Sequence, residues 1–371
     1  MWLFSALMYI IFIFMGVTSG LTPLFSRQAT PFGVAVAGKH EYIEKHKKRF
    51  ALWNILVSLI IGLPLFLMPL MEDAERAEMG SAIYATVGII LFLIFSFILY
   101  LSYRNKIMKW KQTLPEVEQR KAKKVVIDMN YHQKVKAKNH FTFFIWQFAI
   151  ILIPVILAFA FYDRIPEEIP VQWDSQFEVS RSISKSIWGV LALPGIQVLM
   201  IPVFNYSNHA IIKSKQRLSP LDPSGASEKS RRFREAWSNF TFGITIATQL
   251  LISSLFLYSM FSQGRYSWFL IVVIGLFLLF TAGGTLYLTL KYGQAGEKLL
   301  EEEEQFYEDP DEETQWKAGV FYYNKEDPSV FVEKRFGIGS TLNLARWQSW
   351  LFIIGILLFI VLTIVWSITL T

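Results

Sequence analysis

The sequence predicts an all-α fold, a polytopic membrane bundle of about eight transmembrane helices. Hydrophobic residues make up 53% of the 371 positions and charged residues only 18%, whereas a soluble domain averages about 25% charged residues. The charges lie between apolar runs of about 20 residues, the length at which a helix crosses a hydrocarbon core. Lys and Arg are concentrated in alternate connections, which indicates a fixed orientation in the membrane.

Eight apolar segments carry this prediction, and none of them contains a charged residue. Tryptophans fall near many of their ends, where amphipathic rings settle at the level of the lipid headgroups. The expected spans are residues 2–25, 51–71, 81–103, 141–162, 187–206, 240–261, 268–290 and 350–370. The first segment has no early Lys or Arg, so we expect a retained helix and not a cleaved signal peptide.

The distribution of basic residues predicts the orientation. Thirty-one of the 36 Lys and Arg residues lie in four connections, residues 26–49, 104–140, 207–239 and 291–349. The other five lie in the alternate connections, residues 72–80, 163–185 and 263–266. Basic loops stay in the cytoplasm. We therefore expect the four basic connections inside, and segment 163–185 and both termini outside.

The two halves of the chain share short patterns. "KHKKRFALWN" precedes the second span and "SRRFREAWSN" the sixth, while "LYLSYR" ends the third span and "LYLTLK" the seventh. These pairs predict a parallel 4+4 duplication, although convergence explains them equally well. The expected organisation is a first four-helix membrane half at 1–162, an extracytoplasmic loop at 163–185, a second membrane half at 186–290, a cytoplasmic acidic segment and cap at 291–349, and a final span at 350–371.

The residue types exclude several kinds of chemistry. The chain has no cysteine, so it has no disulfide, zinc-thiolate site or thiol nucleophile. Its spans hold no charge of the kind that marks proton relays and ion pathways. No phosphate-binding loop, nucleophile motif or zinc-protease motif is found. We therefore predict no enzyme activity, cofactor or metal. The intramembrane amides are interpreted as interhelical hydrogen-bonding groups; they are Gln147, Gln197, Asn205 and Gln249.

Other segments predict packing and partners. "GVTSG", residues 16–20, and "TAGG", residues 281–284, have small residues that allow close helix contact. "RKAKK", residues 120–124, is suited to anionic headgroups of the lipid bilayer. The acidic run 299–313 is expected to extend the seventh span into the cytoplasm. No recognisable nucleic-acid-binding fold is present, so we expect no nucleic acid partner.

Residues 165–185, "IPEEIPVQWDSQFEVSRSISK", resemble a family signature. The segment is similar to a bacterial membrane domain of unknown function shared with the SdpI-type immunity and signalling proteins of Gram-positive bacteria. That domain reads I-P-x-x-[IV]-P-x-H-[FW]-[ND]-x-x-G-x-x-D, with a Ser-Lys before the next span. The matching positions are Ile165, Pro166, Ile169, Pro170, Trp173, Asp174 and Lys185. Gln172 replaces the His, Phe177 the Gly and Ser180 the second acid. A metal or protonation role of that His is therefore not expected here.

Residues 316–346, "WKAGVFYYNKEDPSVFVEKRFGIGSTLNLAR", are similar to a cytoplasmic C-terminal domain that often accompanies the first one. "TPFGVAV", residues 30–36, resembles a third feature of such proteins. We interpret residues 316–346 as a folded cap over the cytoplasmic helix ends, with ligand binding as the alternative. The candidate cap residues are Tyr322, Tyr323, Asn324, Asp327, Pro328, Lys334, Arg335, Gly337, Gly339 and Asn343. Asn324 and Asp327 suit a turn, and Lys334 and Arg335 suit the headgroup layer.

The resemblance implies a non-enzymatic immunity, sensing or signalling protein in a bacterial plasma membrane. In this hypothesis Trp173 and Phe177 are aromatic anchors in the outer loop, and Asp174 and Glu178 attract a cationic extracellular peptide. The cytoplasmic loops meet a soluble regulator. The alternative is a transporter or permease, in which prolines mark broken helices around a central site. Those prolines are Pro64, Pro69, Pro154, Pro194 and Pro202. A lipid-acting enzyme is ranked last, because no acid–base pair lies near the spans.

Overall fold

The computed structural model describes residues 2–36, 38–70, 74–114, 136–173, 179–214, 223–262, 268–299, 314–337 and 339–369. It confirms the all-α membrane fold. The long helices are α1 (Trp2–Phe25), α2 (Glu41–Gly62), α3 (Ala74–Lys111), α6 (His140–Ala160), α7 (Ile187–Lys213), α8 (Pro223–Phe261), α9 (Trp268–Tyr292) and α11 (Trp347–Thr369). Within the described ranges, seven of these are long and apolar enough to cross a membrane, and α11 contains the shorter apolar stretch Trp347–Leu362.

Several helices begin or end well outside the apolar segments that predicted them. Helix α2 begins at Glu41, α3 continues to Lys111, and α8 begins at Pro223. Hydropathy detects only the part of a helix inside the hydrocarbon. It therefore gives no signal for these polar extensions, which all lie on the expected cytoplasmic side.

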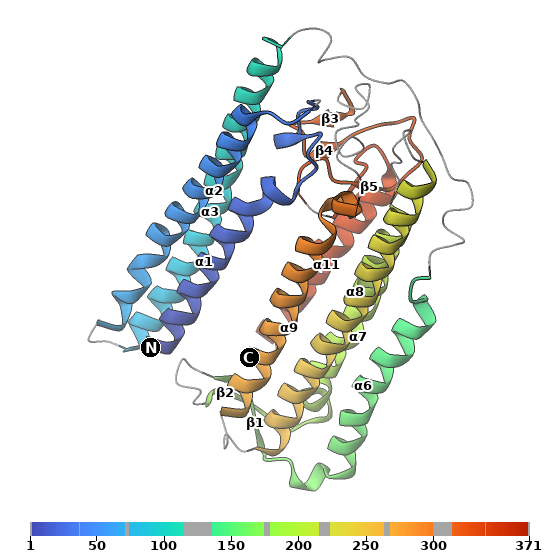
Figure 1. Cartoon of the computed structure of the whole chain (residues 1–371). Helices are drawn as coiled ribbons and strands as arrows, with labels where there is room; N and C mark the ends of the chain where they lie inside the picture. Colours follow the sequence, from blue (N-terminus) through green and yellow to red (C-terminus); the bar gives the residue numbers. More distant parts are fainter. Residues whose placement is uncertain are drawn as a thin grey trace.

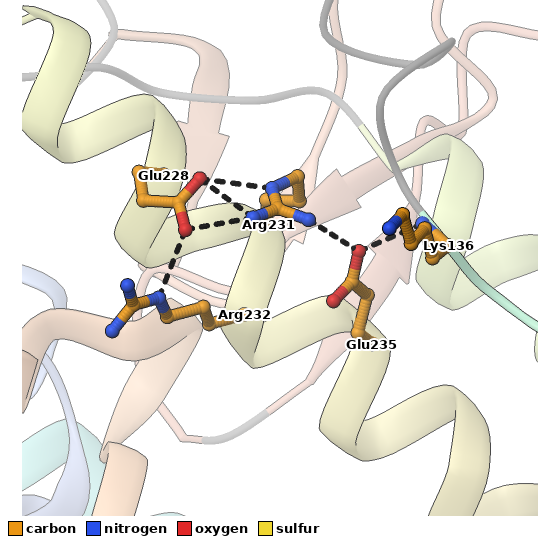
Figure 2. Close-up of polar contacts among 5 residues, drawn as sticks. All are labelled: Lys136, Glu228, Arg231, Arg232 and Glu235. Carbon is orange, nitrogen blue, oxygen red and sulfur yellow. Dashed lines mark hydrogen bonds and ion pairs between the residues drawn. The ribbon is translucent and has the colours of Figure 1, made fainter.

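Charged pairs stabilise the polar extension of α8 (Figure 2). Glu228 lies 2.7 Å from Arg231 and 2.9 Å from Arg232, and Arg231 also lies 2.9 Å from Glu235. The backbone N–H of Lys136 donates to Glu235 at 2.7 Å. Pairs three or four residues apart stabilise a helix by about 0.2–0.5 kcal/mol each. The same contacts fasten the segment that leads into α6 to the side of α8.

Small residues bring α1 against α2. A Cβ added at Gly16 would lie 1.9 Å from Ser58 Oγ, and one at Gly20 would lie 2.9 Å from the Ala51 carbonyl oxygen. These two helices therefore pack backbone to backbone, which confirms the packing role predicted for "GVTSG". In "TAGG", a Cβ at Gly284 would lie 2.2 Å from the Phe240 ring of α8. Gly283 faces open space, so only one of the two glycines makes the predicted close contact.

The helices form two groups (Figure 1). Helices α1, α2 and α3 pack with one another, while α6, α7 and α8 pack together and α9 lies against α8. Helix α6 was assigned to the first membrane half, yet its helical neighbours are α7 and α8. The boundary expected near residue 162 is therefore not the boundary between the packed groups. The 4+4 duplication itself stays a prediction.

Three small antiparallel sheets supplement the helices. Strand β1 (Glu168–Trp173) pairs with β2 (Val179–Ser184), β3 (Trp316–Lys317) with β4 (Phe321–Tyr322), and β5 (Phe331–Glu333) with β6 (Ser340–Leu342). These strands were not predicted, because two to six residues are too few to show a clear alternation of apolar and polar side chains. The β1–β2 hairpin lies at the end of the bundle where both termini lie, and the other strands lie at the opposite end (Figure 1).

Candidate functional site

The segment expected to be a loop at 163–185 contains a β-hairpin seated on the helix ends. Ile169 of β1 lies opposite Ile183 of β2. Both side chains are buried, together with Ile165, against Val190 of α7 and Phe256 of α8. The register shifts on either side of Gln172, and such a bulge bends a strand and redirects its side chains. The apolar positions of the signature thus hold the hairpin in place.

Two contacts fix this hairpin to the end of α8. The Ser259 hydroxyl donates to the carbonyl oxygen of Pro170, in a buried hydrogen bond. The rings of Trp173 and Tyr258 lie 5.8 Å apart, centroid to centroid. Trp173 was predicted to be an aromatic anchor for a ligand, but its half-buried ring packs on α8.

Some of the other signature residues make contacts within the hairpin, and others are exposed on its surface. The Lys185 backbone N–H donates to the Glu167 carbonyl at 2.7 Å, and its ammonium lies 3.4 Å from the Glu167 carboxylate and 4.9 Å from the centre of the Tyr162 ring. Lys185 therefore closes the base of the hairpin. Pro166 is half-buried there, and Gln172 is exposed opposite Arg181. Asp174 and Phe177 lie outside the described residues.

A chain of buried amide side chains joins three helices in the middle of the bundle, with Gln249 between Gln197 and Gln147. Gln197 of α7 donates to the Gln249 side chain of α8 at 2.9 Å and to its carbonyl at 2.9 Å. Gln249 donates to Gln147 of α6 at 3.3 Å. All three side chains are buried, so the interhelical role predicted for them is confirmed. Asn205 differs, because it donates to Ile201 of its own helix.

At the opposite end, a buried carboxylate joins the two helix groups. Glu333 of β5 lies 2.5 Å from Arg27, which follows α1, and 3.2 Å from Arg234 of α8. The Arg234 side chain is only 1% exposed and also donates to the carbonyl oxygen of Ser214 at 2.7 Å. None of these three charged residues was singled out from the sequence. Arg234 lies in "SRRFREAWSN", which contains two further arginines, and nothing in this composition distinguishes the buried arginine from the other two.

The cap residues form a compact hydrogen-bonded core. Asn343 is fully buried and donates to the carbonyls of Asn324 at 2.8 Å and Asp327 at 3.1 Å. The buried Tyr322 hydroxyl donates to the Asp327 carboxylate at 2.9 Å. The Asn324 side chain accepts from the backbone of Glu326 at 2.9 Å, which confirms the predicted turn. Tyr323 and Pro328 are exposed. Most polar residues of the cap signature therefore make hydrogen bonds within the cap itself.

The loop after α1 connects the cap to the first helix group. Phe32 is fully buried against Phe50, Tyr103 and Phe336. Its neighbour Gly33, with a φ of +72°, presents a carbonyl that accepts from Arg104 at 2.8 Å and from Arg335 at 2.9 Å. A glycine suits this left-handed backbone.

Lys334 and Arg335 differ from the headgroup role expected for them. Arg335 is fully buried in protein, where its carbonyl accepts from Thr30 at 2.9 Å. The headgroup assignment is wrong for Arg335, because its side chain is buried in protein and its Nε donates to the Gly33 carbonyl in the loop after α1. Burial lowers the pKa of the Lys334 ammonium below its ordinary value. Gly337 and Gly339 follow with φ of +86° and +97°, and the Gly337 N–H donates to Ser26 at 2.8 Å.

Comparison with protein families matches the chain to two short regions of unknown function. Residues 149–198 are similar to a domain of unknown function, DUF1648, which covers the end of α6, the hairpin and the first part of α7. Residues 325–350 are similar to a family of unknown function, DUF5808, which covers most of the cap. No curated protein matches the chain, and no solved structure matches it either. The two matched regions lie at opposite ends of the bundle.

Proposed function

We propose that this protein is a non-enzymatic sensing or immunity protein of the bacterial cell envelope. In this proposal the outer hairpin recognises an extracytoplasmic peptide, and the cap with the basic loops meets a cytoplasmic regulator. One observation carries the proposal: a single helix, α8, contacts the hairpin at one end and the cap at the other. A change in the hairpin thus has a direct mechanical route to the cap.

The contacts along α8 are spaced as this route requires. Ser259 and Tyr258 hold the hairpin, Gln249 joins α6 and α7 at mid-height, and Arg234 binds Glu333 of the cap. A helix rises about 1.5 Å per residue, so the segment from Arg234 to Ser259 is about 37 Å long. That length exceeds the ~30 Å thickness of a hydrocarbon core. A continuous helix with contacts at both ends is one physical element through which two sites can be coupled.

The packing in the middle of the bundle favours a sensing or immunity role over a transporter. The transporter alternative predicts broken helices at mid-membrane. Helices α6 and α7 instead continue through Pro154, Pro194 and Pro202. The other two prolines, Pro64 and Pro69, lie in short 3-10 turns after α2 ends at Gly62. Between them, Gln147, Gln197 and Gln249 are buried and bonded to one another. Amides that satisfy each other in this way stabilise a packed bundle.

The test combines a gene deletion with complementation. Cells lacking the gene are exposed to a panel of synthetic cationic amphipathic peptides, and transcription of the neighbouring genes is measured. We expect greater sensitivity to at least one peptide or a changed transcript level. Wild-type protein restores the phenotype, whereas Trp173→Ala and Glu333→Gln do not at equal membrane abundance. Gly275→Ala is the matched control, because nothing lies within 4 Å of an added Cβ there. Unchanged sensitivity together with unchanged transcription would refute the proposal.

A further inference from the structure

A strip of aromatic rings joins the polar extensions of α2 and α3. The Tyr42 ring of α2 stacks on Trp110 of α3, with centroids 5.0 Å apart and planes at 16°. Four residues further along α2, the His46 ring meets Tyr103 of α3 at 5.6 Å, and Tyr42 and His46 are in contact with each other at 4.2 Å. Residues four or seven apart share one face of a helix. The four rings therefore form one continuous strip across the two helices.

Two exposed cations border this strip. The Lys106 ammonium lies 5.0 Å from the centre of the Tyr103 ring, and Arg49 is close enough for its charge to act on the same tyrosine. Both cations are exposed, and no carboxylate of the described residues pairs with either of them. Residues 39–49 and 104–111 together contain nine Lys and Arg but only two Glu. The strip is therefore the aromatic part of a strongly basic surface.

The Tyr42–Trp110 pair lies beyond the lipid headgroups on the expected cytoplasmic side. Exposed tryptophans of membrane proteins settle at the headgroup level, and Trp53 of α2 is 51% exposed. Tyr42 precedes Trp53 by eleven residues, which correspond to about 16 Å along a helix axis. This end of the strip is therefore presented to the aqueous phase, where a protein can reach it.

The chemistry of the surface fits an acidic segment of a protein. Trp, Tyr and Arg are the residue types that contribute most to binding energy at protein interfaces, and Trp110, Tyr42 and Arg49 supply one of each. Exposed cations attract carboxylates and speed association with acidic partners. The stacked rings, and the Lys106 ammonium over Tyr103, are already held by contacts within the chain. Binding therefore loses less side-chain entropy.

We infer that the ring strip of α2 and α3, with Arg49 and Lys106, is the docking surface for an acidic segment of a cytoplasmic protein. The inference rests on the proposed function, because it gives the chemistry and the place of contact of the cytoplasmic regulator. Tyr103 also stacks on Phe32, which packs on Phe336 of the cap. The docking surface thus shares a ring with the core that joins the cap to the first helix group.

The test measures binding of an acidic peptide to the full-length protein in phosphatidylcholine nanodiscs. The probe is a fluorescein-labelled peptide of Glu, Leu and Phe, and the reference peptide has Gln in place of every Glu. Fluorescence anisotropy gives the dissociation constant. We expect Tyr42→Ala and Trp110→Ala to weaken binding about tenfold each, and Lys106→Gln to weaken it about threefold. Thermal unfolding midpoints check that each variant keeps its fold, and the exposed Lys106 offers a test that leaves the ring packing intact.

The matched control is Lys291→Gln. Lys291 is an exposed lysine that also lies over tyrosine rings, 5.4 Å from the centres of Tyr287 and Tyr292. It is at the end of α9, on the same side of the bundle as the strip (Figure 1). The measurement uses purified protein and the deletion test uses cells, so failure of the docking surface is distinguishable from failure of the proposed function.

Each outcome decides the inference. Binding that the ring variants and Lys106→Gln weaken, and that Lys291→Gln keeps, supports the docking surface. Equal weakening in the two lysine variants would mean general charge attraction and would overturn it. Absence of binding, or equal binding of the reference peptide, would overturn it as well.

Two further measurements decide between occupants. Loss of peptide binding when phosphatidylglycerol is added to the nanodiscs would assign the surface to lipid. Binding that appears only after the four glutamates at 301–304 are replaced by Gln would assign it to the acidic run of this chain. Either result would overturn docking of a separate protein, and binding that is unchanged in both measurements supports it.

Discussion

Arg234 and Glu333 form an ion pair of 3.2 Å between α8 and the cap, and both side chains are almost fully buried. Glu333 also binds Arg27 at 2.5 Å, so one carboxylate holds a cation from each helix group. Burying charges is costly unless they are paired and hydrogen-bonded. Glu333 is therefore the buried carboxylate through which the cap contacts both helix groups at once.

Replacing that carboxylate should loosen the cap strongly. Glu333→Ala leaves two guanidinium groups without their shared buried carboxylate, and breaking a buried ion pair costs about 3–5 kcal/mol. We expect a clear drop in the thermal unfolding midpoint of the detergent-solubilised protein. Glu228→Ala is the control, because its pairs on the surface of α8 are more exposed and such pairs contribute about 0–1 kcal/mol. Equal effects of the two substitutions would contradict this account of the cap.

Adding one methyl group between α1 and α2 should also destabilise the protein. A Cβ at Gly20 meets the backbone of Ala51 at 2.9–3.0 Å, and backbone cannot rotate away as a side chain can. We expect Gly20→Ala to cost about 1–3 kcal/mol through overpacking. Gly275→Ala, in open space on α9, should be neutral or slightly stabilising, because Ala favours helix over Gly. Thermal unfolding of both variants in the same detergent tests the difference, and a stable Gly20→Ala protein would rule out the tight contact.

The buried amide of Asn343 should control the local stability of the cap. Its side chain satisfies the carbonyls of Asn324 and Asp327 and accepts from the Asn324 backbone at 3.1 Å. Leaving a buried polar group without a partner costs about 1–3 kcal/mol. In Asn343→Ala we expect faster amide hydrogen exchange throughout residues 316–346. In contrast, Tyr323→Ala removes an exposed side chain of the same cap and should leave exchange in the core unchanged.

Stability should depend on pH through Lys334. Burial lowers its pKa in the folded protein, so between the folded and the unfolded pKa the unfolded chain binds more protons. Stability then rises with pH in that window. We expect the unfolding midpoint of the wild type to rise relative to that of Lys334→Met between about pH 7 and pH 10. Lys325→Met replaces an exposed lysine of the cap and serves as the control. A gap between wild type and Lys334→Met that stays constant over this range would argue against a desolvated ammonium.

Features encoded within about 20 residues were predictable from the sequence. The apolar segments gave the helices, "GVTSG" gave the α1–α2 contact, and Asn324 gave the turn in the cap. The Arg27–Glu333 pair joins residues 306 positions apart, and no local pattern reports which distant charges meet. The hairpin was missed for a different reason: its inward positions are few, and a bulge interrupts their alternation. Trp173 was recognised as important, but the side chain that it contacts, Tyr258, lies in a span that carried no signal.

The distance along the chain between Arg27 and Glu333 has a consequence for biosynthesis. A ribosome adds about 5–20 residues per second, so about 15–60 s separate the emergence of these two residues. During that time the loop after α1 holds Arg27, Thr30 and Gly33 without the cap groups that later bind them. This connection is thus completed only after residues 333–335 have been made. A chain that stops before the cap would leave Arg27, Thr30 and Gly33 without the groups of Glu333 and Arg335 that bind them in the complete fold.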